Sequence, residues 1–78
     1  MKFEELLEVP FEGQIELRVC NYDAPSGYNT VYRGELHGVQ KALETAYGLG
    51  SYFLQMTVSS CYAAYDGEIF TVIELEDE

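Results

Sequence analysis

The sequence predicts an α+β fold: a short N-terminal helix, then two strands, one main helix and two further strands. We expect a four-stranded antiparallel sheet with the main helix packed on one face. Two observations predict this order: four segments alternate apolar and polar residues, and one nine-residue segment repeats its apolar residues at helical spacing. With 78 residues the chain is long enough for a single small acidic domain, residues 1–78.

The first segment, Lys2–Glu8, has helical character. Phe3, Leu6 and Leu7 recur at helical spacing, while the glutamates between them face away. Pro10 is expected to end this helix, because the residue before a proline avoids the α region.

Two strands follow. Gln14–Asn21 alternates apolar residues (Ile15, Leu17, Val19) with polar ones, the period of a half-buried strand. Asp23–Gly27 is rich in turn-forming residues and predicts a protruding loop. Tyr28–Arg33 is the next strand, and we expect Gly34 to break it.

The main helix is predicted over Val39–Tyr47. Its apolar stripe is expected to contribute Leu36, Val39, Leu43 and Tyr47 to the core. Gly48 is a typical residue to end it.

Residues 51–75 predict a long β-hairpin. The arms are Ser51–Cys61 and Ile69–Leu75, and Asp66-Gly67 is a dipeptide that tolerates positive φ at both central positions of a tight turn. We expect the sheet face opposite the helix to show tyrosines and polar residues to solvent.

Charge is the strongest compositional signal. Fourteen acidic residues against four basic ones give a net charge of −10. One interpretation is that this charge keeps the protein dispersed in solution; the other is that an acidic surface binds a basic partner. The charge disfavours direct binding to nucleic acid or to an anionic membrane surface. The sequence also has no signal peptide and no apolar run long enough to cross a membrane, so we expect a soluble, intracellular protein.

We expect neither catalysis nor a bound metal or cofactor, so the chain is predicted not to be an enzyme. His37 is the only histidine and Cys20 and Cys61 form no CxxC pair, which argues against a zinc site. Four basic residues give little means to activate a thiol, and no two carboxylates stand out as a general acid and base. Cys20 and Cys61 are expected to be free thiols. A disulfide between them would require that their two strands are neighbours in the sheet.

The candidate partner-binding residues are acids near both ends of the chain, acids on loops, and tyrosines beside those loops. If the termini lie close together, as they often do in small domains, their carboxylates form one negative field. The tyrosines beside the loops have two interpretations. They stiffen the hairpins by pairing across strands, or they serve as rigid contacts at an interface with a partner. The candidates are Glu4, Glu5, Glu8, Glu12, Tyr22, Asp23, Tyr28, Tyr65, Asp66, Glu68, Glu74, Glu76 and Asp77.

The opening residues 1–9 and the closing residues 66–75 resemble small acidic proteins encoded by phages and prophages of Gram-positive bacteria. Some proteins of this kind are anti-CRISPR or other anti-defence inhibitors that occupy the nucleic-acid site of a host nuclease. The resemblance implies an inhibitor, working in the cytoplasm of an infected bacterial cell, that binds a basic nucleic-acid-handling host protein through an acidic, DNA-mimicking surface. The alternative is a small structural or adaptor module that acts by sheet-edge pairing or as a homodimer.

Overall fold

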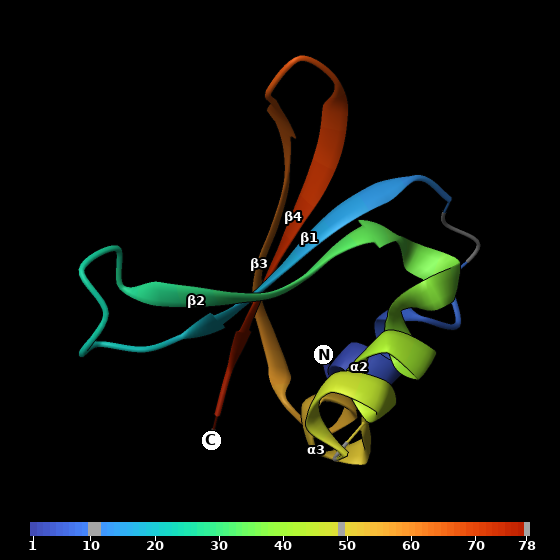
Figure 1. Cartoon of the computed structure of the whole chain (residues 1–78), viewed down its shortest axis with the longest axis vertical. Coiled ribbons are helices and arrows are strands. Elements are labelled where there is room, and N and C mark those ends of the chain that lie inside the picture. Colours follow the sequence, from blue (N-terminus) through green and yellow to red (C-terminus); the bar gives the residue numbers. More distant parts are fainter. Residues whose placement is uncertain (10–11, 49, 78) are drawn as a thin grey trace.

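A computed structural model describes residues 1–9, 12–48 and 50–77 (Figure 1). In chain order the elements are α1 (Phe3–Leu6), β1 (Gln14–Cys20), β2 (Tyr28–Glu35), the 3-10 turn η1 (Leu36–Gly38), α2 (Val39–Tyr47), α3 (Gly50–Leu54), β3 (Thr57–Tyr65) and β4 (Ile69–Glu76). The α+β class with a four-stranded sheet is confirmed, whereas the order of the elements differs from the prediction, because η1 and α3 accompany α2 between β2 and β3.

The four strands form one mixed sheet in the order β2-β1-β4-β3. The outer pairs, β1 with β2 and β3 with β4, are antiparallel, whereas the central strands β1 and β4 are parallel. The predicted all-antiparallel sheet is therefore wrong. The helical segments carry the chain from β2, in the first antiparallel pair, to β3, in the second. This connection between the two pairs provides the crossover that the parallel neighbours β1 and β4 require.

The hairpin of β3 and β4 is shorter than the sequence predicted. Residues 51–54 belong to α3, so the first arm begins at Thr57. The turn is also different: Tyr65 pairs with Ile69, and only Gly67 has a positive φ, of 77°. Three residues thus close the hairpin in place of a two-residue Asp-Gly turn.

All helical segments pack on one face of the sheet, and a single apolar cluster lies between them. Ile15 and Leu17 from β1 and Ile73 and Leu75 from β4 meet side chains of the helices there. The members from the helical segments are Phe3, Leu36, Val39, Leu43 and Phe53, and Met56 joins them from the connection between α3 and β3.

The ends of the helices agree only partly with the sequence. The helix α1 ends at Leu6; Pro10, which was expected to end it, lies outside the described residues. Gly48 ends α2 in the left-handed conformation, as predicted. The strand break predicted at Gly34 is wrong, because Gly34 pairs with Ile15 inside β2. Tyr47 is also not a core residue: it is 46% exposed, and its ring contacts Phe53 of the cluster edge-on.

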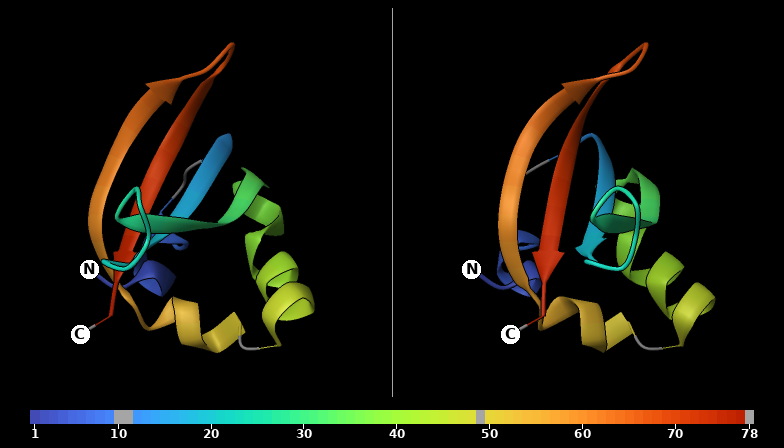
Figure 2. Two further views of the ribbon diagram at one scale, coloured as in Figure 1. Left: turned by 60° about the vertical axis from the view of Figure 1, so that its left-hand side comes forward. Right: turned by 90° about the vertical axis from the view of Figure 1, so that its left-hand side faces the viewer.

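The second face of the sheet is not simply a solvated surface. Val72 and Phe70 point away from the helices, yet they are 0% and 7% exposed. The sheet twists strongly, and the distal part of the β3–β4 hairpin rises beyond the helices (Figure 2). Arg33 on the outer strand β2 covers the ring of Phe70, and Arg18 on the central strand β1 reaches the Tyr62 hydroxyl on the outer strand β3.

Candidate functional site

The two ends of the described chain meet beside the first residues of β3. Thr57 pairs with Glu76 on one side and forms a β-bridge with Lys2 on the other. The amide of Val58 donates to the carbonyl of Met1 at 2.8 Å, and the amide of Phe3 donates to the carbonyl of Met56 at 3.0 Å. The sequence-based expectation that the termini lie close together is therefore correct.

Side chains of α3 and its C-terminal turn tie these ends together. Gln55 donates through Nε2 to Glu4 at 3.0 Å and accepts a hydrogen bond from Nζ of Lys2 at 3.1 Å. The Tyr52 hydroxyl donates to Asp77 at 2.9 Å. This hydrogen bond, together with the negative charge of Asp77, raises the pKa of Tyr52 above its ordinary value.

The carboxylates at this place form what we call the terminal acidic surface: Glu4, Glu5, Glu76 and Asp77. Glu5 belongs to this surface because its Oε1 accepts a hydrogen bond from the backbone amide of Lys2 at 3.0 Å. Lys2 is the residue that forms the β-bridge with Thr57. The first turn of α1 holds both Glu4 and Glu5, where the helix dipole favours acids. Glu78 lies outside the described residues.

Other predicted members of the acidic field lie elsewhere. Glu8 and Glu12 line a cleft of about 700 Å³ beside η1 and the start of α2, together with His37 and Gln40. Glu74 points to the second face of the sheet and lies 3.7 Å from Arg18. The single negative field that the sequence suggested for the acids near both ends is thus divided among the described residues.

The loop candidates lie at opposite ends of the sheet: the β1–β2 loop follows Val19, which pairs with Leu75 near Glu76, whereas the β3–β4 turn is distant from the terminal acidic surface. Tyr22 and Asp23 lie on the β1–β2 loop, where Tyr22 is almost fully exposed. Tyr65, Asp66 and Glu68 lie at the turn of the β3–β4 hairpin, at the opposite end of β4 from Glu76 (Figure 1). These two loops are therefore separate contact points, each with its own tyrosine and acid.

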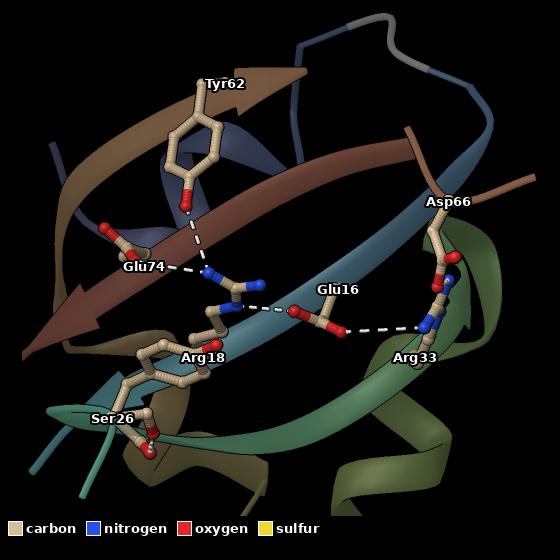
Figure 3. A network of polar contacts seen from close by, with 8 residues as sticks. Glu16, Arg18, Ser26, Arg33, Tyr62, Asp66 and Glu74 are labelled. Atoms are coloured by element: carbon tan, nitrogen blue, oxygen red, sulfur yellow. Dashed lines mark hydrogen bonds and ion pairs between the residues drawn. The ribbon is translucent and has the colours of Figure 1, made fainter. Parts of the chain in front are cut away.

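A polar network that the sequence analysis missed occupies the second face of the sheet (Figure 3). Its centre is Arg18 on β1, whose guanidinium forms an ion pair with Glu16 and donates to the Tyr62 hydroxyl at 3.0 Å. Glu74 lies on the neighbouring strand β4, and the guanidinium stacks 4.2 Å from the ring centre of Tyr28. Arg18 thereby contacts side chains from all four strands.

Arg33 forms the second half of this network. It lies 3.8 Å from Glu16 and 3.8 Å from Asp66, and its guanidinium covers the ring of Phe70 at 4.6 Å. Because Arg33 is on β2 and Asp66 is on the β3–β4 turn, their ion pair spans the sheet from one outer strand to the other hairpin. Tyr28, a predicted contact residue, packs under Arg18 instead of serving as a free ring.

The network changes how charge is distributed over the molecule. Its two arginines and three carboxylates carry a net charge of −1, so nine of the ten net negative charges of the chain lie on other residues. Burial works against the charged form of Arg18, but the hydrogen bond and charge of Glu16 outweigh it and raise the pKa of Arg18. The guanidinium is therefore held in its charged form.

The sequence contained one signal for this network. Glu16 and Arg18 are alternate residues of β1 and therefore share the face opposite Ile15 and Leu17. Their partners on the other strands depend on strand order and register, which the sequence alone did not provide. Tyr52 and Gln55 were missed because residues 51–54 were assigned to a strand.

Sites for other chemistry are not found in the described part of the chain. It contains no group of three or more metal-ligating side chains, and no helix in it is long and apolar enough to span a membrane. Cys20 and Cys61 are free thiols on strands that β4 separates from each other.

Comparison with known proteins returned no match to a family model, to a curated protein or to a solved structure.

Proposed function

We propose that the chain is a non-enzymatic inhibitor that binds a basic, nucleic-acid-handling protein, for example a CRISPR effector nuclease, through its terminal acidic surface. The observation that carries this proposal is the meeting of Glu4 and Glu5 with Glu76 and Asp77 beside β3. A cluster drawn from both ends of the chain gives the fold one concentrated negative area.

The terminal acidic surface has the properties that mimicry of phosphates needs. Tyr52 holds Asp77 and Gln55 holds Glu4, so these two carboxylates have fixed positions on the folded domain. Fixed carboxylates replace phosphates opposite the Lys and Arg side chains of a nucleic-acid channel. The remaining excess of negative charge steers a basic partner toward the molecule, and the chain itself is repelled by DNA and RNA.

Partner and setting follow from the same charge and from the resemblance of the sequence to phage-encoded proteins. The protein would work in the cytoplasm of an infected bacterial cell, where its target is a host enzyme that handles nucleic acid. The loop pairs Tyr22 with Asp23 and Tyr65 with Asp66 would add contacts outside the terminal acidic surface, because exposed tyrosines are efficient interface residues.

The experiment is a pull-down from bacterial lysate at low and at high salt. The test variant carries Glu4→Lys and Asp77→Lys. The matched control carries Glu35→Lys and Glu44→Lys, two exposed acids outside the terminal acidic surface, and therefore has the same change in net charge. Circular dichroism of both variants verifies that they fold.

The proposal predicts that the wild-type chain captures a nucleic-acid-binding protein at low salt and releases it at high salt. The test variant should lose the capture and the control variant should keep most of it. Equal loss in both variants would mean that total charge, and not this surface, determines binding. Capture that does not respond to salt would contradict an electrostatic mimic.

A further inference from the structure

The outer strand β3 is unusual for this chain because it has no charged residue. The sequence of Thr57–Tyr65 is TVSSCYAAY, in a protein with a net charge of −10. The other outer strand, β2, carries Arg33 and Glu35. Charged residues on edge strands are a common protection against pairing with other chains, so β2 is protected in this way and β3 is not.

The N-terminal residues cover only the first part of the edge of β3. The bonds of Met1 and Phe3 to Val58 and Met56 occupy the edge at residues 56–58. A bulge in the pairing of β3 with β4 lies between Val58 and Ser60. Within the described residues, no strand pairs with the outer side of β3 beyond this point.

The backbone groups that face this open edge can be assigned from the register. The amide of Asp66 donates to the carbonyl of Glu68 at 3.1 Å. Tyr65 and Ile69, which flank these two residues, are therefore a non-hydrogen-bonded pair of the antiparallel ladder. Hydrogen-bonded and non-hydrogen-bonded pairs alternate along an antiparallel ladder, and the register is regular from Ser60 to Tyr65. The amides and carbonyls of Cys61, Ala63 and Tyr65 therefore point away from β4, toward the open edge.

The side chains beside this edge are apolar and exposed. Tyr65 is 75% exposed, and Ile69, its partner in register, is 74% exposed. Cys61 and Ala63 are on the same face of the strand and are also exposed. This part of the hairpin lies beyond the helices, so no other element of the fold covers it (Figure 2).

We propose that the chain forms a homodimer in which β3 pairs antiparallel with β3 of a second copy across a twofold axis at Ala63. In this register Ala63 lies opposite Ala63 of the second copy, and Cys61 lies opposite Tyr65. It is the one symmetric register that pairs all three residues whose backbone groups face the edge. It joins the two sheets into one eight-stranded sheet.

A second copy fits this edge better than a basic partner does. A strand without charge offers a basic protein no complementary group, whereas two copies of a chain with a net charge of −10 repel each other wherever acids meet. The β3 edge is a surface on which two such chains can approach without bringing acids together. The small side chain of Ala63 also allows close approach at the axis.

The first test is the molar mass in solution, measured by light scattering over a range of protein concentrations. The wild-type chain should have twice the monomer mass of 8.8 kDa. Ala63→Lys places two like charges opposite each other at the axis and should return the mass to that of the monomer. Asn29→Lys, an equal change of charge at an exposed position of β2, should leave the dimer intact.

The second test is disulfide formation, which reports the register. Ala63→Cys, in a background with Cys20→Ser and Cys61→Ser, should be linked as a dimer by mild oxidation, because directly opposed residues have Cα atoms about 5.5 Å apart, within the range for a disulfide. The wild-type chain should not be linked through Cys61. In the proposed register Cys61 lies opposite Tyr65 of the second copy, which is four positions along the strand from Cys61 of that copy.

Several results would overturn the proposal. One is a monomer at all concentrations, and another is a dimer that Ala63→Lys leaves unchanged. Linkage through Cys61 in the wild-type chain would show a different register. If the chain is monomeric and Ala63→Lys instead abolishes capture of another protein, the edge accepts a foreign strand and self-pairing is wrong. The proposed inhibitor function depends on the terminal acidic surface and shares only Tyr65 with this edge, so it can fail or hold independently.

Discussion

Removing the guanidinium of Arg18 is the most informative perturbation of the fold. Arg18→Met keeps a long apolar stem but removes the partner of Glu16, which is only 8% exposed. The same substitution removes the hydrogen bond to Tyr62 and the stacking on Tyr28. Glu16 then has only Arg33, at 3.8 Å, as its remaining cation.

The size of the effect follows from the burial of the pair. The side chains of Arg18 and Glu16 are 17% and 11% exposed, which places them closer to a buried pair than to a surface pair. Breaking a fully buried pair costs about 3–5 kcal/mol and breaking a surface pair costs about 0–1 kcal/mol. Because Arg33 continues to neutralise Glu16, we expect a loss of about 2–3 kcal/mol in the free energy of unfolding.

Urea denaturation followed by circular dichroism measures this loss. Adding Glu16→Gln to Arg18→Met should restore part of the stability, since it removes the unpaired carboxylate. Lys41→Met is the matched control: it deletes a charge at an exposed position of α2 and should change the stability by less than about 0.5 kcal/mol. If Arg18→Met costs no more than Lys41→Met, the network does not stabilise the second face of the sheet.

Three further predictions test other parts of the structure. Tyr52 has its pKa raised by the hydrogen bond to Asp77, so the stabilisation is present below the ordinary tyrosine pKa and is lost as the pH rises through the raised value; in an ultraviolet titration, Tyr52→Phe should remove a phenolate that forms above the ordinary tyrosine pKa. Gly34 has a φ of 155°, and a Cβ there would lie 2.9 Å from the Tyr32 hydroxyl, so Gly34→Ala should lower the stability by about 1–3 kcal/mol, and an unchanged melting temperature would contradict this. Leu43 is fully buried under α2, and Leu43→Ala should cost about 2–5 kcal/mol in urea denaturation; a smaller loss would show that α2 is not packed on the sheet as described.

The sequence predicted the elements better than their arrangement. Alternation in residues 14–21 and helical spacing in residues 39–47 are local patterns, and the strand and the helix that they predict are confirmed, although Tyr47 lies outside the core. Parallel pairing of β1 with β4 joins residues more than fifty positions apart, and no local pattern distinguishes it from antiparallel pairing. Residues 51–54 are a short apolar segment, for which periodicity alone does not separate helix from strand.

The candidate site was predicted in part for the same reason. Proximity of the termini is a general property of small domains, and it brought Glu4 near Asp77 as expected. The partners of Glu74 and Asp66 could not be predicted, because their contacts with Arg18 and Arg33 depend on the register of separate strands. Composition alone made these acids resemble free surface charges.

Competition with DNA tests the central claim most directly. The binding of the purified chain to its captured partner is measured while the concentration of duplex DNA is increased. If the terminal acidic surface replaces phosphates in the nucleic-acid site, DNA displaces the chain, and Glu4→Lys combined with Asp77→Lys weakens binding before any DNA is added. A stable complex that contains the partner, the DNA and the chain together would contradict the account.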